Sequence, residues 1–265
     1  MKPPVALTIA GTDPSGGAGT SADLKTFGAL GAFGTSVITA VVAQNTQGVA
    51  GFEQLAPDFV RLQLENLLAD VRVDALKIGM LGDAATIRVV AEVLRGRPAR
   101  YVVLDPVMVA KSGHRLLAPE AVAALRDELL PLVDLVTPNL PEAADLLGQK
   151  EVDDEAGMAA QLASLAHLAP GVLLKGGHAD GEESVDLLAI DGATHRLTAP
   201  RVTTKNTHGT GCTLSAAIAA LRPQRADWVA AVTDAKAYLS EALRRADELE
   251  IGHGHGPVHH YHAWW

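Results

Sequence analysis

The sequence has little of what a disulfide-linked, membrane-spanning or secreted protein needs. Its 265 residues include one cysteine, Cys212, so no disulfide can form within the chain, and this usage fits a reducing compartment. No apolar run is long enough to span a bilayer, and the run after Pro4 is too short for the apolar region and cleavage site of a signal peptide. We therefore expect a soluble, cytoplasmic protein without membrane partners.

Aromatic residues and clustered positive charge are also scarce. Only 4% of the residues are aromatic although 48% are hydrophobic, so the core must consist of Ala, Val, Leu and Ile, as in helix-covered parallel sheets. The formal net charge is −9 without a basic cluster, which argues against nucleic acid as a partner. No repeat or flexible linker divides the chain, and we expect residues 1–265 to form a single domain.

Apolar runs typical of strands alternate with helical segments along the chain. The expected strands cover residues 5–10, 36–43, 74–78, 101–104, 133–136 and 171–174, with a hairpin over 184–190 and 194–199. The expected helices cover residues 22–30, 57–68, 83–94, 119–130, 141–147, 154–168, 214–221 and 227–249. This alternation predicts an α/β fold with a mainly parallel sheet and helices on both faces.

Residues suited to ligand binding follow nearly every expected strand. Ligands of such sheets bind beyond the carboxyl ends of the strands. A series of suitable residues at that edge therefore argues for one site assembled from many loops. The residues in question are Gly11, Asp13, Gln44, Met80, Asp105, Asn139 and Lys175.

A glycine-bracketed turn, residues 209–212, opens the expected helix over 214–221. Gly209 and Gly211 let the backbone come close to a ligand, and the first N–H groups of the helix point outward at the positive end of its dipole. That geometry binds anions, most often phosphate. A thiol at a helix N-terminus is more acidic than a free thiol, so Cys212 is suited to accept a proton from a substrate hydroxyl. The alternative is a small apolar residue packed under the helix.

A second glycine-rich segment, the glycine loop (residues 11–19), follows the first strand. Ser21 is the expected cap of the helix after it. The loop matches neither the phosphate-binding pattern G-x-x-x-x-G-K-[ST] nor the dinucleotide fingerprint, because Gly17-Ala18-Gly19 lacks the third glycine. A ligand-binding loop and a plain strand-to-helix connection both remain open.

The acidic candidates each have a plain structural explanation as well. Asp105 either helps to hold Mg²⁺ or bonds the backbone of its own turn. Glu142 lies three residues after Asn139, a spacing that also matches a helix capping box. Asp23 falls in the first turn of a helix, where acidic residues are favoured.

The remaining candidates suit a heterocycle or a phosphate. The amide of Gln44 both donates and accepts hydrogen bonds, as recognition of a heterocycle requires. Met80 and Val107 either sandwich such a ring or belong to the core. Lys175 and Lys236 either reach a phosphate or stay solvated.

The C-terminal segment, residues 252–265, holds half of the chain's ten histidines and two tryptophans. Adventitious metal binding is open to such a segment, but no cysteine or carboxylate stands at a structural zinc spacing from it. We expect a docked tail whose tryptophans cover apolar surface, without a catalytic role.

Taken together, these motifs resemble the hydroxymethylpyrimidine/phosphomethylpyrimidine kinases of thiamine biosynthesis, members of the ribokinase-like superfamily. The resemblance runs essentially from end to end. Its motifs occupy residues 10–19, 23–26, 42–46, 77–81, 105–108, 137–142, 175–178 and 208–212.

The resemblance implies a three-layer αβα fold, a homodimer, and two successive phosphorylations that use ATP and Mg²⁺. The first phosphorylates the hydroxymethyl group of 4-amino-5-hydroxymethyl-2-methylpyrimidine, and the second converts the monophosphate to the pyrophosphate. The resemblance also places cysteine, here Cys212, where most of the superfamily has a catalytic aspartate.

The resemblance further implies a role for each candidate residue. Cys212 becomes the general base beside an anion-binding turn of Gly209, Thr210 and Gly211. The pyrimidine pocket is expected to contain Gln44, Gly11, Asp23, Met80 and Val107. The nucleotide side is expected to contain Asp105, Asn139, Glu142, Lys175 and Lys236, with Asp105 and Glu142 as the Mg²⁺ ligands.

Two other functions stay open. A pyridoxal-type kinase binds a ring of similar size and again phosphorylates a hydroxymethyl group. A non-catalytic ligand-binding or regulatory protein could have kept the pocket, but its expected signature is loss of residues 209–212 or of Asp105 and Glu142, all of which are present.

Overall fold

One large sheet organises the fold of the computed structural model, which describes residues 2–108, 117–177 and 182–265. Its strands are β1 (Val5–Ala10), β2 (Phe33–Ile38), β5 (Ala75–Ile78), β6 (Tyr101–Leu104), β7 (Leu135–Val136), β8 (Val172–Lys175), β9 (Glu183–Ile190) and β10 (Ala193–Pro200). They lie in the order β10-β9-β8-β7-β6-β5-β1-β2. The pairs from β8 to β2 are parallel, and β9 is antiparallel to both of its neighbours, so the mainly parallel sheet and the hairpin are confirmed.

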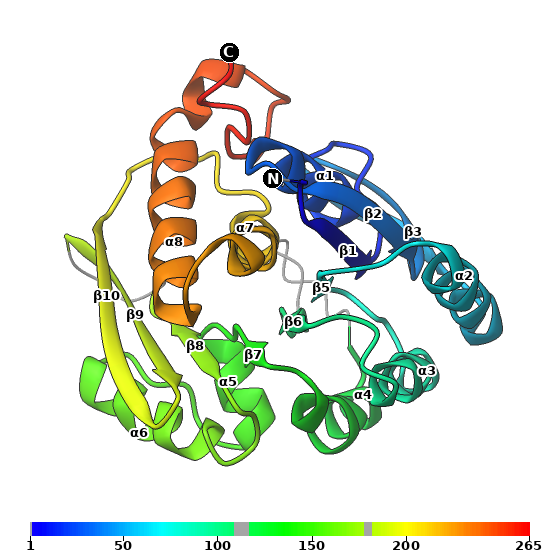
Figure 1. Cartoon of the computed structure of the whole chain (residues 1–265). Coiled ribbons are helices and arrows are strands. Elements are labelled where there is room, and N and C mark those ends of the chain that lie inside the picture. The colour runs from blue at the N-terminus through cyan, green and yellow to red at the C-terminus, as the bar shows by residue number, and fades with distance from the viewer. Residues whose placement is uncertain (1, 109–116, 178–181) are drawn as a thin grey trace.

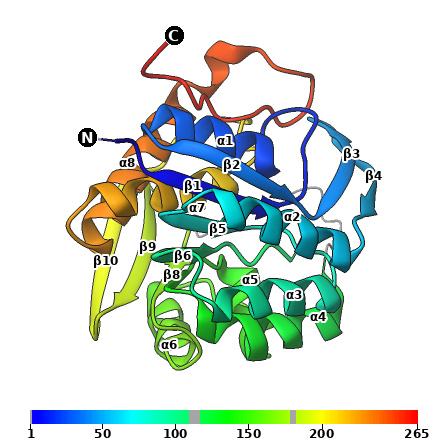
Figure 2. The same cartoon turned by 45° about the vertical axis from the view of Figure 1, so that its right-hand side comes forward.

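Helices cover both faces of this sheet (Figures 1 and 2). On one face lie α1 (Gly19–Ala29), α7 (Thr210–Leu221) and α8 (Trp228–Arg244). On the other lie α2 (Pro57–Asp70), α3 (Ala84–Arg95), α4 (Pro119–Ala124), α5 (Leu140–Leu147) and α6 (Glu155–Leu165). The predicted three-layer αβα arrangement is confirmed.

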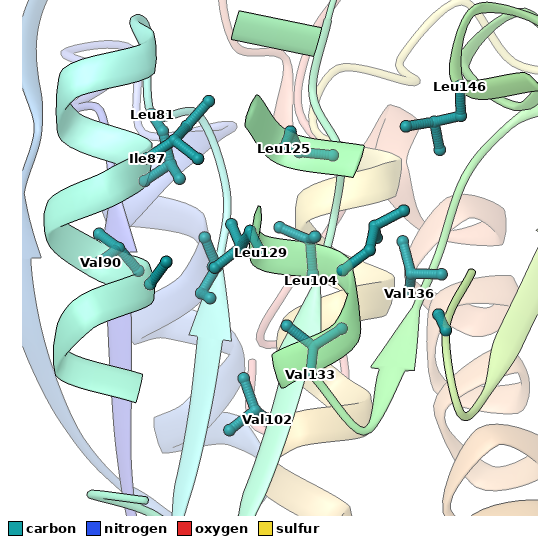
Figure 3. Packing of buried hydrophobic residues seen from close by; sticks show 14 of the residues in the cluster. Leu81, Ile87, Val90, Val102, Leu104, Leu125, Leu129, Val133, Val136 and Leu146 are labelled. Atoms are coloured by element: carbon teal, nitrogen blue, oxygen red, sulfur yellow. The ribbon is translucent and has the colours of Figure 1, made fainter. Parts of the chain in front are cut away.

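The two cores follow from the alternation of side chains along each strand. In β6, Val102 and Leu104 pack in the core beneath α3 and α4, whereas Val103 faces α7 on the opposite side. Figure 3 shows Leu104 facing Leu129 between the strands and the helical layer. Fully burying such a side chain contributes about 1.5–3 kcal/mol. Both cores consist mostly of Ala, Val, Leu and Ile, as the composition predicts.

The prediction of a single strand over residues 36–43 is wrong. The chain turns at Thr39, whose N–H donates to the Ala10 carbonyl at 3.0 Å and whose hydroxyl donates to the Met80 carbonyl at 2.7 Å. After this turn, β3 (Ala40–Asn45) pairs with β4 (Gly48–Gln54) in a separate antiparallel sheet (Figure 2). Gln44 therefore lies on a hairpin outside the main sheet.

Several helix boundaries also differ from the prediction. Ser21 does not cap α1, because the helix begins before it, at Gly19, and its hydroxyl donates to the Asp13 carbonyl at 3.0 Å. The helix expected over residues 119–130 is α-helical only to Ala124 and then continues as a π-helical and a 3-10 turn. Pro131 lies in the 3-10 turn and has no N–H with which to continue an α-helix. Within the described residues, no helix is long and apolar enough to cross a membrane.

The C-terminal segment is docked beside α1 (Figure 1). Val258 and His260 are buried, whereas Trp264 and Trp265 are 68% and 70% exposed, so the expectation that the tryptophans cover apolar surface is wrong. Trp265 packs one face on His259, with ring centroids 5.1 Å apart. The described residues contain no group of three or more His, Cys, Asp or Glu side chains that could hold a metal ion. His178, the last residue of one motif, lies outside the described residues.

Candidate active site

Two cavities meet at the carboxyl ends of the parallel strands. The Gln44 cavity, of about 240 Å³, is bounded by the glycine loop, the β3–β4 hairpin and the start of α7. The Lys236 cavity, of about 320 Å³, is bounded by β9, α8 and the same start of α7. Residues shared by both walls are Asn139, Lys175, Thr207, Thr210 and Gly211. A group at this shared wall is therefore accessible from both sides.

The turn at residues 209–212 forms the centre of the shared wall. Gly209 caps α7 with a φ of 77°, and a Cβ there would lie 1.7 Å from the Gly17 carbonyl oxygen, so only glycine fits. No described side chain caps this helix. Its first N–H groups have no partner within the helix, and they lie at the positive end of the helix dipole. The turn is suited to bind an anion, as the sequence predicts.

Cys212 lines the Gln44 cavity, but its thiol is not acidic. Burial raises the pKa of the Cys212 thiol to about 11, against an opposing effect of the Lys77 ammonium. The prediction of an acidic thiol is wrong because desolvation of the thiolate outweighs the favourable helix dipole at this position. The alternative, a small apolar residue packed under the helix, differs from this position, because Cys212 is half-buried and lies on the cavity wall.

The pyrimidine-pocket candidates converge with one exception. Gln44, Gly11, Met80 and Val107 all line the Gln44 cavity. Met80 and Val107 pack together with the apolar part of the hairpin, so the cavity has one apolar wall. The side chain of Gln44 lies near the Asp13 carboxylate and helps to lower its pKa.

Asp23 is the exception, and the prediction that it lines the pocket is wrong. Its side chain is fully buried beneath the cavity, where Oδ2 accepts from the Thr8 hydroxyl at 2.6 Å and from Lys77 Nζ at 2.9 Å. Burial disfavours the charge of Lys77, but the neighbouring Asp23 carboxylate keeps the pKa of Lys77 above its ordinary value. Asp23 therefore acts on the site through Lys77.

The acidic candidates lie around Lys175. Its Nζ is 3.0 Å from Asp105 Oδ1 and 4.0 Å from Glu142 Oε2. Burial raises the pKa of Glu142 to about 7, whereas Asp105 and Glu142 raise the pKa of Lys175 against the effect of its burial. Asn139 and Glu142 also form the capping box of α5, with bonds of 2.8 and 2.9 Å between each side chain and the other's N–H. The capping alternative is therefore confirmed, and it positions Glu142 on the wall of the Gln44 cavity.

Lys236 lies at the far side of the Lys236 cavity. Its Nζ donates to Asp186 Oδ2 at 2.6 Å, and both side chains are largely buried. The Asp186 carboxylate also accepts the Gly176 N–H at 3.0 Å. Lys236 is thus a positioned cation on the cavity wall, and a solvated lysine is excluded.

One contact of the site was not predicted: Asp13 appears among the strand-end residues expected to bind a ligand, but its pairing with His208 does not follow from the sequence. Asp13 is buried in the glycine loop, and its Oδ2 lies 2.8 Å from Nε2 of His208. His208 precedes the 209–212 turn and lines the Gln44 cavity. The signal available in the sequence was a carboxylate in a glycine-rich loop and a histidine beside a glycine turn, but 195 residues separate them.

Comparison with known proteins agrees with this geometry. The family model described as phosphomethylpyrimidine kinase matches residues 13–259. The chain belongs to the phosphomethylpyrimidine kinase family. The hydroxymethylpyrimidine/phosphomethylpyrimidine kinase of Escherichia coli K12 is 59% identical over 266 residues, which cover 100% of both chains.

Solved structures of ribokinase-like kinases also superpose closely on this member of the family. Pyridoxal kinase of Staphylococcus aureus in complex with AMP-PCP and pyridoxal has a TM-score of 0.90 at 34% identity and covers 99% of this chain and 95% of its own. Phosphomethylpyrimidine kinase of Clostridium difficile 630 has a TM-score of 0.79 at 40% identity and covers 91% of this chain and 99% of its own. The family expected from the motifs is confirmed.

Proposed function

We propose that this protein transfers the γ-phosphate of ATP first to the hydroxymethyl group of 4-amino-5-hydroxymethyl-2-methylpyrimidine and then to the monophosphate so formed, as a step of thiamine biosynthesis. The observation that carries the proposal is the wall shared by two cavities, with an anion-binding helix start at its centre and the Cys212 thiol on one side. Family membership supports the substrate class.

The pyrimidine is assigned to the Gln44 cavity. The Gln44 amide lines this cavity, and an amide both donates and accepts hydrogen bonds. It therefore suits the ring, which offers an acceptor nitrogen next to an amino donor. Met80 and Val107 supply the apolar contact for the faces of the ring.

The nucleotide is assigned to the Lys236 cavity. Lys236 and Lys175 provide positive charge there, and the N–H groups of residues 210–212 lie where the two cavities meet. Phosphoryl transfer depends mainly on positioning and on stabilisation of charge spread over the phosphoryl oxygens. These groups supply both without movement of the sheet.

The residues around Lys175 fit a Mg²⁺ ion. Asp105 and Glu142 present carboxylate oxygens to one point, and Mg²⁺ is usually held by one or two carboxylates together with water and substrate phosphate. When bound, the ion neutralises charge on the phosphates. Lys175 now neutralises the two carboxylates, and its long side chain leaves it able to turn to a phosphate oxygen instead.

Cys212 is assigned the role of general base, which accepts the proton of the substrate hydroxyl. A thiolate with a pKa of about 11 is scarce at neutral pH but strongly basic, and the Lys77 ammonium favours it. The alcohol becomes acidic only as its oxygen bonds to phosphorus. The base is therefore needed late in a loose transition state, where a scarce thiolate suffices.

The proposal is tested by counting phosphates. Purified protein is incubated with hydroxymethylpyrimidine and ATP–Mg²⁺, and products are separated and weighed by mass spectrometry. We expect the monophosphate to appear first and the pyrophosphate to follow from it. Consumption of neither pyrimidine nor ATP would refute kinase activity on this substrate.

A second candidate is phosphorylation of a pyridoxal-type ring. It is favoured by the fold similarity to the Staphylococcus aureus kinase whose structure contains pyridoxal. The Gln44 cavity has no described feature that rejects a second six-membered ring with a hydroxymethyl group. Comparison of kcat/KM for the two rings under the same conditions decides which is the main substrate.

The protein is also proposed to be a homodimer. Large hydrophobic side chains are exposed on β2, on α2 and on the β3–β4 hairpin, namely Phe33, Val41, Phe52, Phe59 and Leu62. Light scattering from the purified protein is expected to give twice the mass of one chain, and a mass of one chain would exclude the dimer.

A further inference from the structure

The glycine loop has the composition of a phosphate-binding loop, but its N–H groups form hydrogen bonds within the loop itself. The Asp13 carboxylate accepts the N–H groups of Ser15 at 2.8 Å, Gly17 at 3.1 Å and Ala18 at 2.7 Å. Burial alone would raise the pKa of the Asp13 carboxyl, but hydrogen bonds from the side chains of His208 and Ser15 hold it well below its usual range. The buried aspartate thus occupies the position that a phosphate takes in such a loop, and the loop has few N–H groups left for a ligand.

His208, which precedes the turn at residues 209–212, forms a further hydrogen bond to this carboxylate. Because a carboxylate only accepts, Nε2 of His208 carries the hydrogen and donates to Asp13 Oδ2 at 2.8 Å. The same edge of the ring packs on the glycine loop, since a Cβ at Gly17 would lie 2.5 Å from His208 Cδ2. The side chain remains 16% exposed, and it lines the Gln44 cavity. The uncovered edge of the imidazole is therefore the one that carries Nδ1.

Nδ1 of His208 has no hydrogen-bond partner among the described residues, although Nε2, like the two lysine ammonium groups on the cavity wall, contacts a carboxylate. Lys77 is fully buried against Asp23. Lys175 lies at the shared wall against Asp105, where the nucleotide is assigned. Of the three described cationic or titratable nitrogen side chains around the Gln44 cavity, His208 is the one with a second ring nitrogen left for a ligand.

The two proposed reactions place different demands on the Gln44 cavity. The first acceptor is a neutral alcohol, which must lose a proton. The second acceptor is a phosphate monoester with a second pKa near 6, so it is mostly a dianion at neutral pH. The dianion needs no base, but it must be held close to the negatively charged γ-phosphate of ATP.

We propose that the doubly protonated imidazole of His208 donates from Nδ1 to the phosphate of the monophosphate during the second transfer, while Asp13 holds the ring in orientation by accepting from Nε2. This inference rests on the proposed function. In the step itself an oxygen of the acceptor phosphate forms a bond to the γ-phosphorus, and the bond from that phosphorus to the β–γ bridging oxygen breaks. ADP leaves with the electron pair, no proton is released from the dianion, and total charge is conserved.

The test uses a matched pair of variants. The amide nitrogen of glutamine takes the position of Nε2, so His208→Gln keeps the bond to Asp13 and loses the group at Nδ1. Asparagine takes the position of Nδ1, so His208→Asn keeps a donor towards the cavity and loses the bond to Asp13. Each reaction is measured separately, with the alcohol or with the chemically prepared monophosphate as the acceptor.

We expect His208→Gln to lower kcat/KM of the second reaction about 10-fold or more beyond any change in the first, as loss of a hydrogen bond to a charged group predicts. His208→Asn is expected to change both reactions by similar factors. Equal changes of both reactions in His208→Gln, including no change in either, would overturn the proposal. Absence of a second phosphate in the wild-type product would instead refute the proposed function.

A measurement on the wild-type protein does not depend on how the variants fold. With ¹⁵N-labelled histidine, addition of the monophosphate is expected to shift the Nδ1 resonance of His208, and addition of the alcohol is expected to shift it less. Equal responses to the two ligands would contradict a contact with the phosphate.

Discussion

Two lysine–aspartate ion pairs near the cavities have nearly the same N–O distance but differ in how far their side chains are exposed. Lys77 Nζ lies 2.9 Å from Asp23 Oδ2, and neither side chain is exposed. Lys175 Nζ lies 3.0 Å from Asp105 Oδ1, and the two side chains are 14% and 3% exposed. Lys175 lies on the wall shared by both cavities, and Asp105 lies on the wall of the Gln44 cavity.

The comparison shows that access separates the roles of the two pairs. The Lys77–Asp23 pair cannot exchange partners with a ligand, so it stabilises the fold and places a fixed positive charge below Cys212. The Lys175–Asp105 pair can exchange one partner for a phosphate or a cation. Breaking the buried pair should therefore cost stability, and breaking the accessible pair should cost turnover.

Removal of one charge from the buried pair is expected to have the largest effect. Lys77→Met leaves the Asp23 carboxylate buried without its counter-ion, which typically costs about 3–5 kcal/mol of unfolding free energy. Denaturant unfolding measures this loss. The control is the double variant Lys77→Met, Asp23→Leu, which is expected to recover much of the stability. A single variant as stable as the wild type would show that the pair does not hold the fold.

The matching change in the accessible pair is Asp105→Asn. Loss of one group that organises charge around a transferring phosphoryl group lowers kcat about 10²- to 10³-fold in comparable sites. The midpoint of unfolding is expected to stay within a few degrees of the wild type, because the amide still accepts a hydrogen bond from Lys175. A variant that unfolds early but keeps its turnover would reverse the roles of the two pairs.

A variant at Gln44 tests whether binding of the pyrimidine can be weakened separately from binding of the nucleotide. Gln44→Ala removes hydrogen bonds to the ring, and we expect KM for the pyrimidine to rise about tenfold at a cost of about 1.4 kcal/mol. Steady-state kinetics with each substrate varied in turn gives both KM values. Equal increases of KM for the pyrimidine and for ATP would contradict the assignment of the two cavities.

The smallest expected effect comes from Glu142, which lies next to the accessible pair. Its titration is expected to make the free energy of unfolding depend on pH. Burial raises its pKa from 4.5 to about 7 in the folded protein. The folded chain therefore binds this proton more tightly than the unfolded chain, and the stabilisation is lost as pH rises from about 4.5 to about 7. Thermal unfolding of wild type and Glu142→Gln at several pH values measures it, since the variant lacks this titration. Parallel curves for the two proteins would contradict the raised pKa.

The sequence was sufficient to predict the main sheet and its two helical layers, because alternating apolar runs determine both. It was insufficient at Thr39, where the apolar pattern continues but hydrogen bonds to Ala10 and Met80 turn the chain. Those partners come from other strands, and a single run of residues does not contain them. Gln44 nevertheless lines the same cavity as Gly11, Met80 and Val107, because the hairpin folds back over the carboxyl ends of the strands.

The candidate site was predictable in position but not in electrostatics. The strand-end residues converge as expected, whereas Asp23 and Cys212 differ from expectation because burial depends on neighbours far along the chain. Burial hides Asp23 and raises the pKa of the thiol. The bond between Asp13 and His208 was not predictable for the same reason, since it joins the first loop to the last helix start.

The most direct test of the account is the turnover of Cys212→Ala in the first phosphorylation. The account places the thiol beside the acceptor hydroxyl, so kcat is expected to fall about 10²-fold or more while KM for the pyrimidine changes little. Near-normal kcat in this variant would contradict the account, because another group would then take the proton.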